Sequence, residues 1–206
     1  LALLAAAADI HPIDVLLAHP PTPATLERLP PPHDALAVSV LADRPAHARW
    51  LAETLPPHVS LWLDVDLGMH RTGSSPESWL AEPLGEALLG RLAGLHGYDG
   101  HLRAAQRAEA HAGYDALAAL ARDLGVPELE RCTSGSHSYA HALSHHGFPS
   151  SRHTVSPGTL VLSDLRSHPA HDELGLRYAA YVASRVISEP QPGRITLDAG
   201  SKAISP

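Results

Sequence analysis

The chain of 206 residues is 44% hydrophobic and 18% charged and carries a formal net charge of −7, which is typical of a globular protein and excludes a basic nucleic-acid surface. No apolar stretch approaches the roughly 18 residues of a membrane span, so neither nucleic acid nor a membrane is an expected partner. The single cysteine, Cys132, excludes an internal disulfide and favours a reducing, cytoplasmic location.

Short apolar or β-branched runs alternate along the chain with longer Ala/Leu/Arg-rich stretches of helical period. The runs predict six strands, at residues 14–19, 36–40, 60–66, 92–98, 130–135 and 153–158. Between them, residues 45–55 and 101–125 predict helices, and Gly125 is a typical residue just after a helix end. The apolar stripe predicted for the second helix consists of Leu102, Ala105, Ala112, Leu117, Leu120 and Leu124.

Strand–helix alternation of this kind predicts an α/β fold with parallel strands and helices packed outside. Six strands fit either an open doubly wound sheet or part of a (β/α)8 barrel, and the absence of G-x-G-x-x-G weakens the dinucleotide-binding version. The pattern changes near residue 175. Residues 177–188 and 193–200 then predict two consecutive strands joined by the Pro/Gly-rich turn "EPQPG", as in an antiparallel β domain.

Polar residues gather where predicted strands end, which is where a barrel carries its functional side chains. In "DVDLGMHRTG", residues 64–73, Arg71 offers a fixed fork of donors to an oxyanion or phenolate, unless it is an ordinary surface arginine. In "GLHGYDGH", residues 94–101, the Tyr98 ring can stack on a planar ligand and His101 can transfer a proton near neutral pH. Asp99 is interpreted equally well as a helix N-cap.

Two Gly/Ser-rich loops follow the last two predicted strands of the barrel-like part, "TSGSHS" at residues 133–138 and "VSPGT" at residues 155–159. Small residues expose backbone N–H groups, and hydroxyls can point at an anion. Loops after the final two strands of a (β/α)8 barrel frequently bind phosphate. Together the two loops predict a phosphate site.

Four histidines lie close together in the sequence, at His137, His141, His145 and His146. An i, i+4 pair on a helix can bind zinc, but no carboxylate or second cysteine accompanies them. We interpret the segment as a solvated histidine-rich turn and predict no metal site in this chain.

Five stretches in order resemble the D-threonine aldolase and D-serine dehydratase family of pyridoxal-phosphate enzymes, which have an alanine-racemase-type barrel followed by a β domain. They are "LDVDLGMHRTG", "GLHGYDGH", "TSGSHSYAHA", "VSPGTLVLSD" and "AAYVASRVISEPQPGRITLDAGSKAIS", over about residues 60–205. The resemblance implies an incomplete barrel over residues 1–174, about strands 3 to 8, and the beginning of the C-terminal β domain over residues 175–206. The "YDGH" and "SRVIS" portions are closer to the D-threonine aldolase branch.

The resemblance implies a role for each matching residue. Arg71 would face the phenolic oxygen of pyridoxal 5′-phosphate, Tyr98 would lie beside the cofactor ring, and Tyr98 and His101 are the catalytic candidates. The implied phosphate-binding residues are Ser134, Gly135, Ser136, Gly158 and Thr159.

The resemblance also implies the chemistry. Alanine racemases place an arginine against the pyridine nitrogen just before a Pro-Gly, where this chain has Ser156. A neutral hydroxyl cannot replace the electronic effect of a guanidinium, so a lyase is favoured over a racemase. The implied reaction is retro-aldol cleavage of a D-3-hydroxy amino acid to glycine and an aldehyde, assisted by a divalent metal, Zn or Mn, in a homodimeric parent protein.

The family forms its Schiff base through a lysine on the first barrel strand, which by resemblance would precede Leu1, and its metal ligands would follow Pro206. The only lysine, Lys202, falls in the part that resembles the β domain and is interpreted as a turn residue there. We therefore expect the chain to be a fragment lacking both ends and inactive by itself.

Three alternatives stay open. The first is a D-serine dehydratase-like deaminating lyase, and the second is a non-catalytic pyridoxal-phosphate-binding barrel, which the β-domain stretch disfavours. The third is an unrelated metal-dependent barrel hydrolase, for which residues 36–40, 130–135 and 153–158 lack the histidine pattern.

Overall fold

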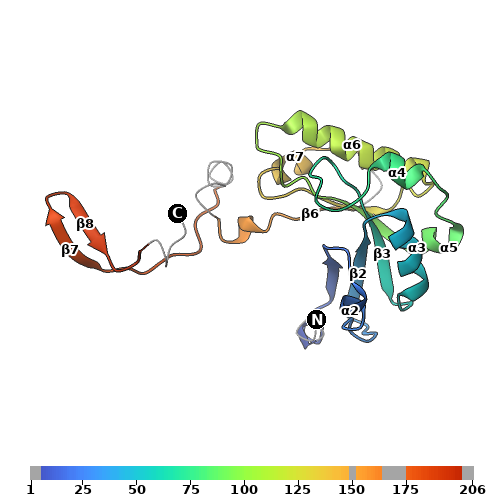
Figure 1. The fold of residues 1–206 in the computed structure, drawn as a ribbon, viewed down its shortest axis with the longest axis horizontal. Helices are drawn as coiled ribbons and strands as arrows, with labels where there is room; N and C mark the ends of the chain where they lie inside the picture. Colours follow the sequence, from blue (N-terminus) through green and yellow to red (C-terminus); the bar gives the residue numbers. More distant parts are fainter. Residues whose placement is uncertain (1–5, 149–151, 164–174, 201–206) are drawn as a thin grey trace. The chain divides into compact units, whose positions relative to one another are not determined.

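The computed structural model describes residues 6–148, 152–163 and 175–200 (Figure 1). Its main sheet has six parallel strands in the order β1-β2-β3-β4-β5-β6. The strands are β1 (Ile13–Leu17), β2 (Leu36–Ala42), β3 (Val59–Asp64), β4 (Leu92–Gly97), β5 (Glu130–Thr133) and β6 (His153–Val155). The helices are α2 (Pro23–Leu26), α3 (Pro45–Thr54), α4 (Pro76–Leu80), α5 (Glu86–Leu89), α6 (Arg107–Asp123) and α7 (Tyr139–Leu143).

The strand order decides between the two folds that the sequence left open. A doubly wound sheet reverses its order at a switch point, whereas barrel strands follow one another around the barrel. Here each strand pairs with the next one in sequence, without a reversal. The edge strands also approach each other at their beginnings, because the Arg152 guanidinium, just before β6, lies 2.7 Å from the Asp14 carboxylate of β1. The predicted incomplete (β/α)8 barrel is therefore confirmed.

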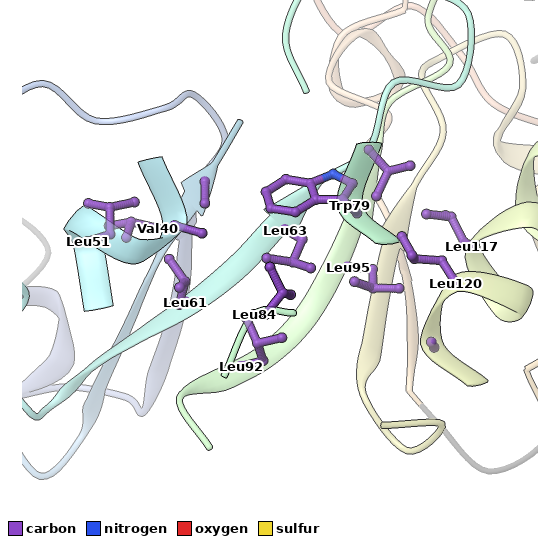
Figure 2. Packing of buried hydrophobic residues seen from close by; sticks show 14 of the residues in the cluster. Val40, Leu51, Leu61, Leu63, Trp79, Leu84, Leu92, Leu95, Leu117 and Leu120 are labelled. Atoms are coloured by element: carbon purple, nitrogen blue, oxygen red, sulfur yellow. The ribbon is translucent and has the colours of Figure 1, made fainter. Parts of the chain in front are cut away.

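The outer face of the sheet carries the main hydrophobic core, between the strands and the helices. Strand side chains such as Val40, Leu61 and Leu95 meet Leu51 of α3 and Leu117 of α6, all of them fully buried. Figure 2 shows this packing, with Trp79 of α4 among the leucines. Because the core lies outside the sheet, the inner face of the strands is left for other side chains.

The inner face holds a smaller apolar cluster of Leu41, Trp62 and Cys132. A cavity of about 300 Å³ lies beside it, lined by residues of β1, β3, β5 and β6. Close packing is visible at Gly94, where an added Cβ would lie 2.6 Å from the Trp62 ring.

Arg91 fixes the connection between α3 and β3. Its guanidinium donates to the carbonyl oxygens of Ala52, Leu55, Pro56 and Val59, at 2.7 to 3.1 Å. These carbonyls include helix-end groups that have no partner within the helix, so one side chain satisfies the whole turn.

Helix α6 begins six residues later than the sequence predicts. Residues 101–106 form turns, and the helix starts at Arg107 after Gln106. The predicted apolar stripe is wrong at Ala105 and Ala112, which are exposed, whereas Leu117 and Leu120 are buried as expected. The buried face also includes Ala110, Tyr114, Ala118 and Ala121, and Gly125 follows the helix with a φ of 74°.

The chain divides into two compact units, residues 1–158 and 159–206. The second contains a 3₁₀ helix, η1 (Thr159–Val161), and an antiparallel hairpin of β7 (Val186–Gln191) and β8 (Arg194–Leu197). The predicted strand over residues 177–188 is paired only from Val186 onward. The predicted domain boundary, between residues 174 and 175, borders residues 164–174, which lie outside the described residues, so it stays a prediction. Lys202 also lies outside the described residues. Within the described residues, no helix is long and apolar enough to cross a membrane.

Candidate functional site

The loop after β3 is a compact structure built on Asp66. Its carboxylate accepts hydrogen bonds from the backbone N–H of Gly68 and His70 and from His70 Nδ1, at 2.7 to 3.0 Å. Although burial raises the pKa of Asp66, the hydrogen bonds from His70 and Gly68 lower it below its usual range. Gly73 closes the loop with a φ of 91°, and a Cβ there would lie 2.8 Å from the Asp64 carbonyl oxygen. The loop therefore holds Arg71 in a defined place.

Arg71 and Tyr98 meet although they follow different strands. The Arg71 guanidinium carbon lies 4.5 Å from the centre of the Tyr98 ring, a cation–π distance. Room for the tyrosine exists because two neighbours are glycines. A Cβ on Gly135 would lie 3.2 Å from Tyr98 Oη, and one on Gly100 would collide with the ring. The structure thus brings together two of the predicted site residues, next to the β5 loop.

Asp99, which follows β4, connects helix α6 with the loop after β5. Its side chain is buried, and Oδ2 accepts from the Tyr114 hydroxyl at 2.6 Å. Oδ1 accepts from the Gly135 N–H at 3.1 Å and from Ser138 Oγ at 2.5 Å. Burial first, and then the Asp99 carboxylate, raise the pKa of Tyr114 far above its usual value. Asp99 is therefore no N-cap of α6: it fixes the predicted phosphate loop.

Ser134 is the residue of that loop best placed to bind an anion. It is completely buried, has a φ of 69°, and its Oγ has no hydrogen-bond partner within the described part of the chain. The Gly135 N–H, in contrast, already donates to Asp99, and Ser136 is half-buried beside it. A buried hydroxyl without a partner costs free energy, so this atom calls for a ligand or water.

The second predicted loop leaves the neighbouring strand. The Ser156 N–H donates to the Thr133 carbonyl at 3.1 Å, which extends the β5–β6 pairing toward both loops. Gly158 ends the first unit and Thr159 begins η1 in the second. Their roles in phosphate binding stay predictions.

His101 lies against the loop after β3. Its Nε2 would be 3.6 Å from a Cβ on Gly68, and its Nδ1 is buried without a partner among the described residues. Its predicted catalytic role stays a prediction.

Sequence reasoning missed a polar pair on the inner face of the barrel. Asp64 ends β3, His96 lies on β4, and the two occupy paired positions in the register. The carboxylate Oδ1 lies 2.7 Å from His96 Nδ1, and both side chains are 3% exposed. The sequence shows each residue as a polar side chain near the end of an apolar strand, but their pairing depends on the register between β3 and β4.

The histidine-rich segment is more buried than predicted. His141 is buried in α7, and the His145 side chain is 5% exposed, packed against the rings of His111, Tyr114 and Phe148. The interpretation as a solvated turn is therefore wrong for these two residues, because His141 is buried in α7 and aromatic rings enclose His145, whereas His146 is exposed. Within the described residues, no group of three or more potential ligands could hold a metal ion.

The chain matches the model of the family described as "Alanine racemase, N-terminal domain" over residues 4–164. The chain belongs to this family. Its members are pyridoxal-phosphate enzymes of the alanine-racemase fold type. A comparison with curated proteins finds no match.

Solved structures share the fold. A D-threonine aldolase from Filomicrobium marinum is 22% identical with a TM-score of 0.66, over 98% of this chain and 58% of its own. A D-threo-3-hydroxyaspartate dehydratase from Delftia sp. HT23 is 21% identical with a TM-score of 0.59, over 92% of this chain and 54% of its own. An alanine racemase from Bacillus anthracis is 13% identical with a TM-score of 0.55, over 91% of this chain and 48% of its own. The chain thus spans about half the length of these proteins.

Proposed function

We propose that the chain is part of a cytoplasmic pyridoxal-phosphate-dependent lyase that cleaves D-3-hydroxy amino acids, such as D-threonine, to glycine and an aldehyde. Family membership supports the cofactor, and the fold likeness to a D-threonine aldolase, over 98% of this chain, supports the substrate class. The observation that carries the proposal is the convergence of Arg71, Tyr98 and the Ser134 loop at the carboxyl ends of three adjacent strands.

The residues present fit the cofactor. Ser134 Oγ is a buried hydroxyl without a partner within the described residues, as a phosphate-binding donor would be before its ligand arrives. Glycines at positions 100 and 135 keep the backbone close to Tyr98 and leave no side chain to fill the space. When bound, the cofactor would withdraw electrons from the substrate Cα.

Each residue has a separate task in this proposal. Ser134 would bind the phosphate, with Gly135, Ser136, Gly158 and Thr159 forming the rest of the loops. Arg71 would donate to the phenolic oxygen, and its stacking on Tyr98 would keep the guanidinium in one orientation. Tyr98 and His101 are the proposed groups for proton transfer at the substrate.

The chemistry favours a lyase because Ser156 occupies the place of the racemase arginine. Its Oγ lies 3.0 Å from Cys132 Sγ, so it pairs with another neutral group. A dehydratase is the second candidate, favoured by the fold likeness to the D-threo-3-hydroxyaspartate dehydratase. The printed description of one dehydratase variant as a metal-free form supports a divalent metal as part of the proposed function.

The proposal is tested with the product of the complete gene and with the 206-residue chain, each supplied with pyridoxal 5′-phosphate, Mn²⁺ and D-threonine. The complete product should release glycine and acetaldehyde, and the short chain should not. Borohydride reduction followed by peptide mass spectrometry should find no pyridoxyl group on Lys202. A pyridoxylated Lys202 together with D-threonine turnover by the short chain would overturn the interpretation of Lys202 as a turn residue.

A further inference from the structure

A second pocket, of about 500 Å³, lies between the loop after β1 and the start of α3. This volume is within the range of small-molecule sites in proteins. Arg71, Tyr98 and Ser134, the residues brought forward for the cofactor, do not line it. The pocket is therefore separate from the candidate functional site, and its own lining has to indicate what it could bind.

The walls of this pocket are flat and largely apolar. On α3 the rings of His47 and Trp50 stack, with centroids 5.6 Å apart and planes inclined by only 21°. Both residues line the pocket, and the segment after β1 contributes Pro20, Pro21 and Pro23. Aromatic faces and proline rings are surfaces on which a planar ring packs well. The shape therefore favours a planar, aromatic ligand.

The charged groups of the pocket favour an anion on that ring. Both carboxylate oxygens of Asp43 are already engaged, Oδ1 at 2.8 Å from His47 Nδ1 and Oδ2 at 3.0 Å from Arg44 Nη1. The Arg44 guanidinium makes no other hydrogen bond within the described part of the chain, and its side chain is 64% exposed. Since a guanidinium has five N–H donors, most of its capacity to bind a carboxylate is unused.

The pocket is held in shape before any ligand binds. The Asp43 carbonyl oxygen accepts from Ser74 Oγ at 2.8 Å, which ties the residue before α3 to the loop after β3. The Asp43 side chain then orients both Arg44 and His47, and the stack on Trp50 keeps the His47 ring in one plane. Preformed walls reduce the entropy lost when a ligand binds.

We propose that this pocket binds a small planar aromatic carboxylate, with its ring against His47 and Trp50 and its carboxylate on the Arg44 guanidinium. The inference goes beyond the proposed function and does not depend on it, because none of the residues proposed for the cofactor takes part.

The test uses the ¹⁵N-labelled chain of 206 residues, with indole-3-acetate as the probe. In ¹⁵N–¹H correlation spectra, titration should shift the indole N–H signal of Trp50 and the backbone signal of His47. A Kd of about 1 mM or below is expected for a ligand of this size. Saturating pyridoxal 5′-phosphate should leave this Kd unchanged. Shifts confined to Tyr98 and the Ser134 loop, or displacement of the probe by pyridoxal 5′-phosphate, would overturn the inference.

Two analogues of the probe separate the contributions of ring and charge. Indole-3-acetamide keeps the planar ring without the charge, and cyclohexylacetate keeps the charge without the planar ring. Each should bind at least about tenfold more weakly than indole-3-acetate, because each loses one of the two contacts. An analogue that binds as tightly as indole-3-acetate would contradict the assigned ligand class.

Variants then test the two contacts in the protein. Arg44→Gln should weaken binding about tenfold by removing the charge-assisted hydrogen bonds. Trp50→Ala should abolish binding and Trp50→Phe should restore most of it. Arg49→Gln is the matched control and should bind as the unchanged chain does, because Arg49 also lies on α3 but pairs with Glu82 at 2.8 Å and does not line the pocket. Arg44 is exposed, so its replacement tests the proposal even if Trp50→Ala does not fold. Equal affinity of Arg44→Gln and Arg49→Gln would overturn the proposal.

Discussion

Replacement of Asp99 should destabilise the protein and loosen the phosphate loop together. The carboxylate accepts three hydrogen bonds, from the Tyr114 hydroxyl, the Gly135 N–H and Ser138 Oγ. Asp99→Asn keeps one acceptor oxygen and loses one charge-assisted bond, which costs about 1.5–3 kcal/mol. Asp99→Ala leaves the Gly135 N–H with Ser138 Oγ as its acceptor at 3.0 Å but removes the acceptor of the Tyr114 and Ser138 hydroxyls, at about 1–3 kcal/mol each, so a loss of at least about 2 kcal/mol of unfolding free energy is expected.

The assay is urea unfolding followed by circular dichroism, with the slope checked for two-state behaviour. Asp123→Asn, at the exposed end of α6, is the control and should change stability by no more than about 0.5 kcal/mol. A double-mutant cycle with Tyr114→Phe should give a coupling energy of about 0.5–3 kcal/mol. An Asp99→Ala variant as stable as the control would refute the role assigned to this carboxylate.

Three further results are expected. Arg91→Lys should cost about 2 kcal/mol in thermal unfolding, since an ammonium cannot reach four carbonyls at once, and an unchanged midpoint would contradict that bonding. Gly94→Ala should cost about 1–3 kcal/mol by crowding Trp62, and a neutral or stabilising effect would show that this part of the barrel is not close-packed. Burial first, and then His145 and Arg131, lower the pKa of His153 to about 4, so the stability it contributes is complete above about pH 6.5 and lost as the pH falls toward 4. His153→Gln should flatten urea midpoints between pH 7.5 and 4.5, and an unaltered pH dependence would exclude His153 as its source.

The sheet could be predicted because its strands are short apolar runs between loops, and all six were located from that pattern. The start of α6 could not, because Asp99 is used in contacts between elements and does not cap the helix. The early start predicted for the hairpin failed for another reason. A strand needs a partner, and β8, with four residues, pairs only from Val186 onward.

Some residues of the candidate site could likewise be named from the sequence, and others could not. Arg71, Tyr98 and Ser134 stand at strand ends in recognisable motifs, so the sequence could name them as candidates, and their roles stay predictions. The pair of Asp64 and His96 depends on the register between β3 and β4, which no local pattern contains. The enclosure of His145 likewise depends on aromatic rings that come from distant parts of the chain.

The central claim, that this barrel binds pyridoxal 5′-phosphate through its phosphate loop, is tested most directly by isothermal titration calorimetry of the 206-residue chain. The account predicts saturable binding of pyridoxal 5′-phosphate, at least tenfold weaker binding of pyridoxal, and loss of most of that difference in Ser134→Ala. Equal affinity for the two compounds, or a Ser134→Ala variant with unchanged preference for the phosphate, would contradict it.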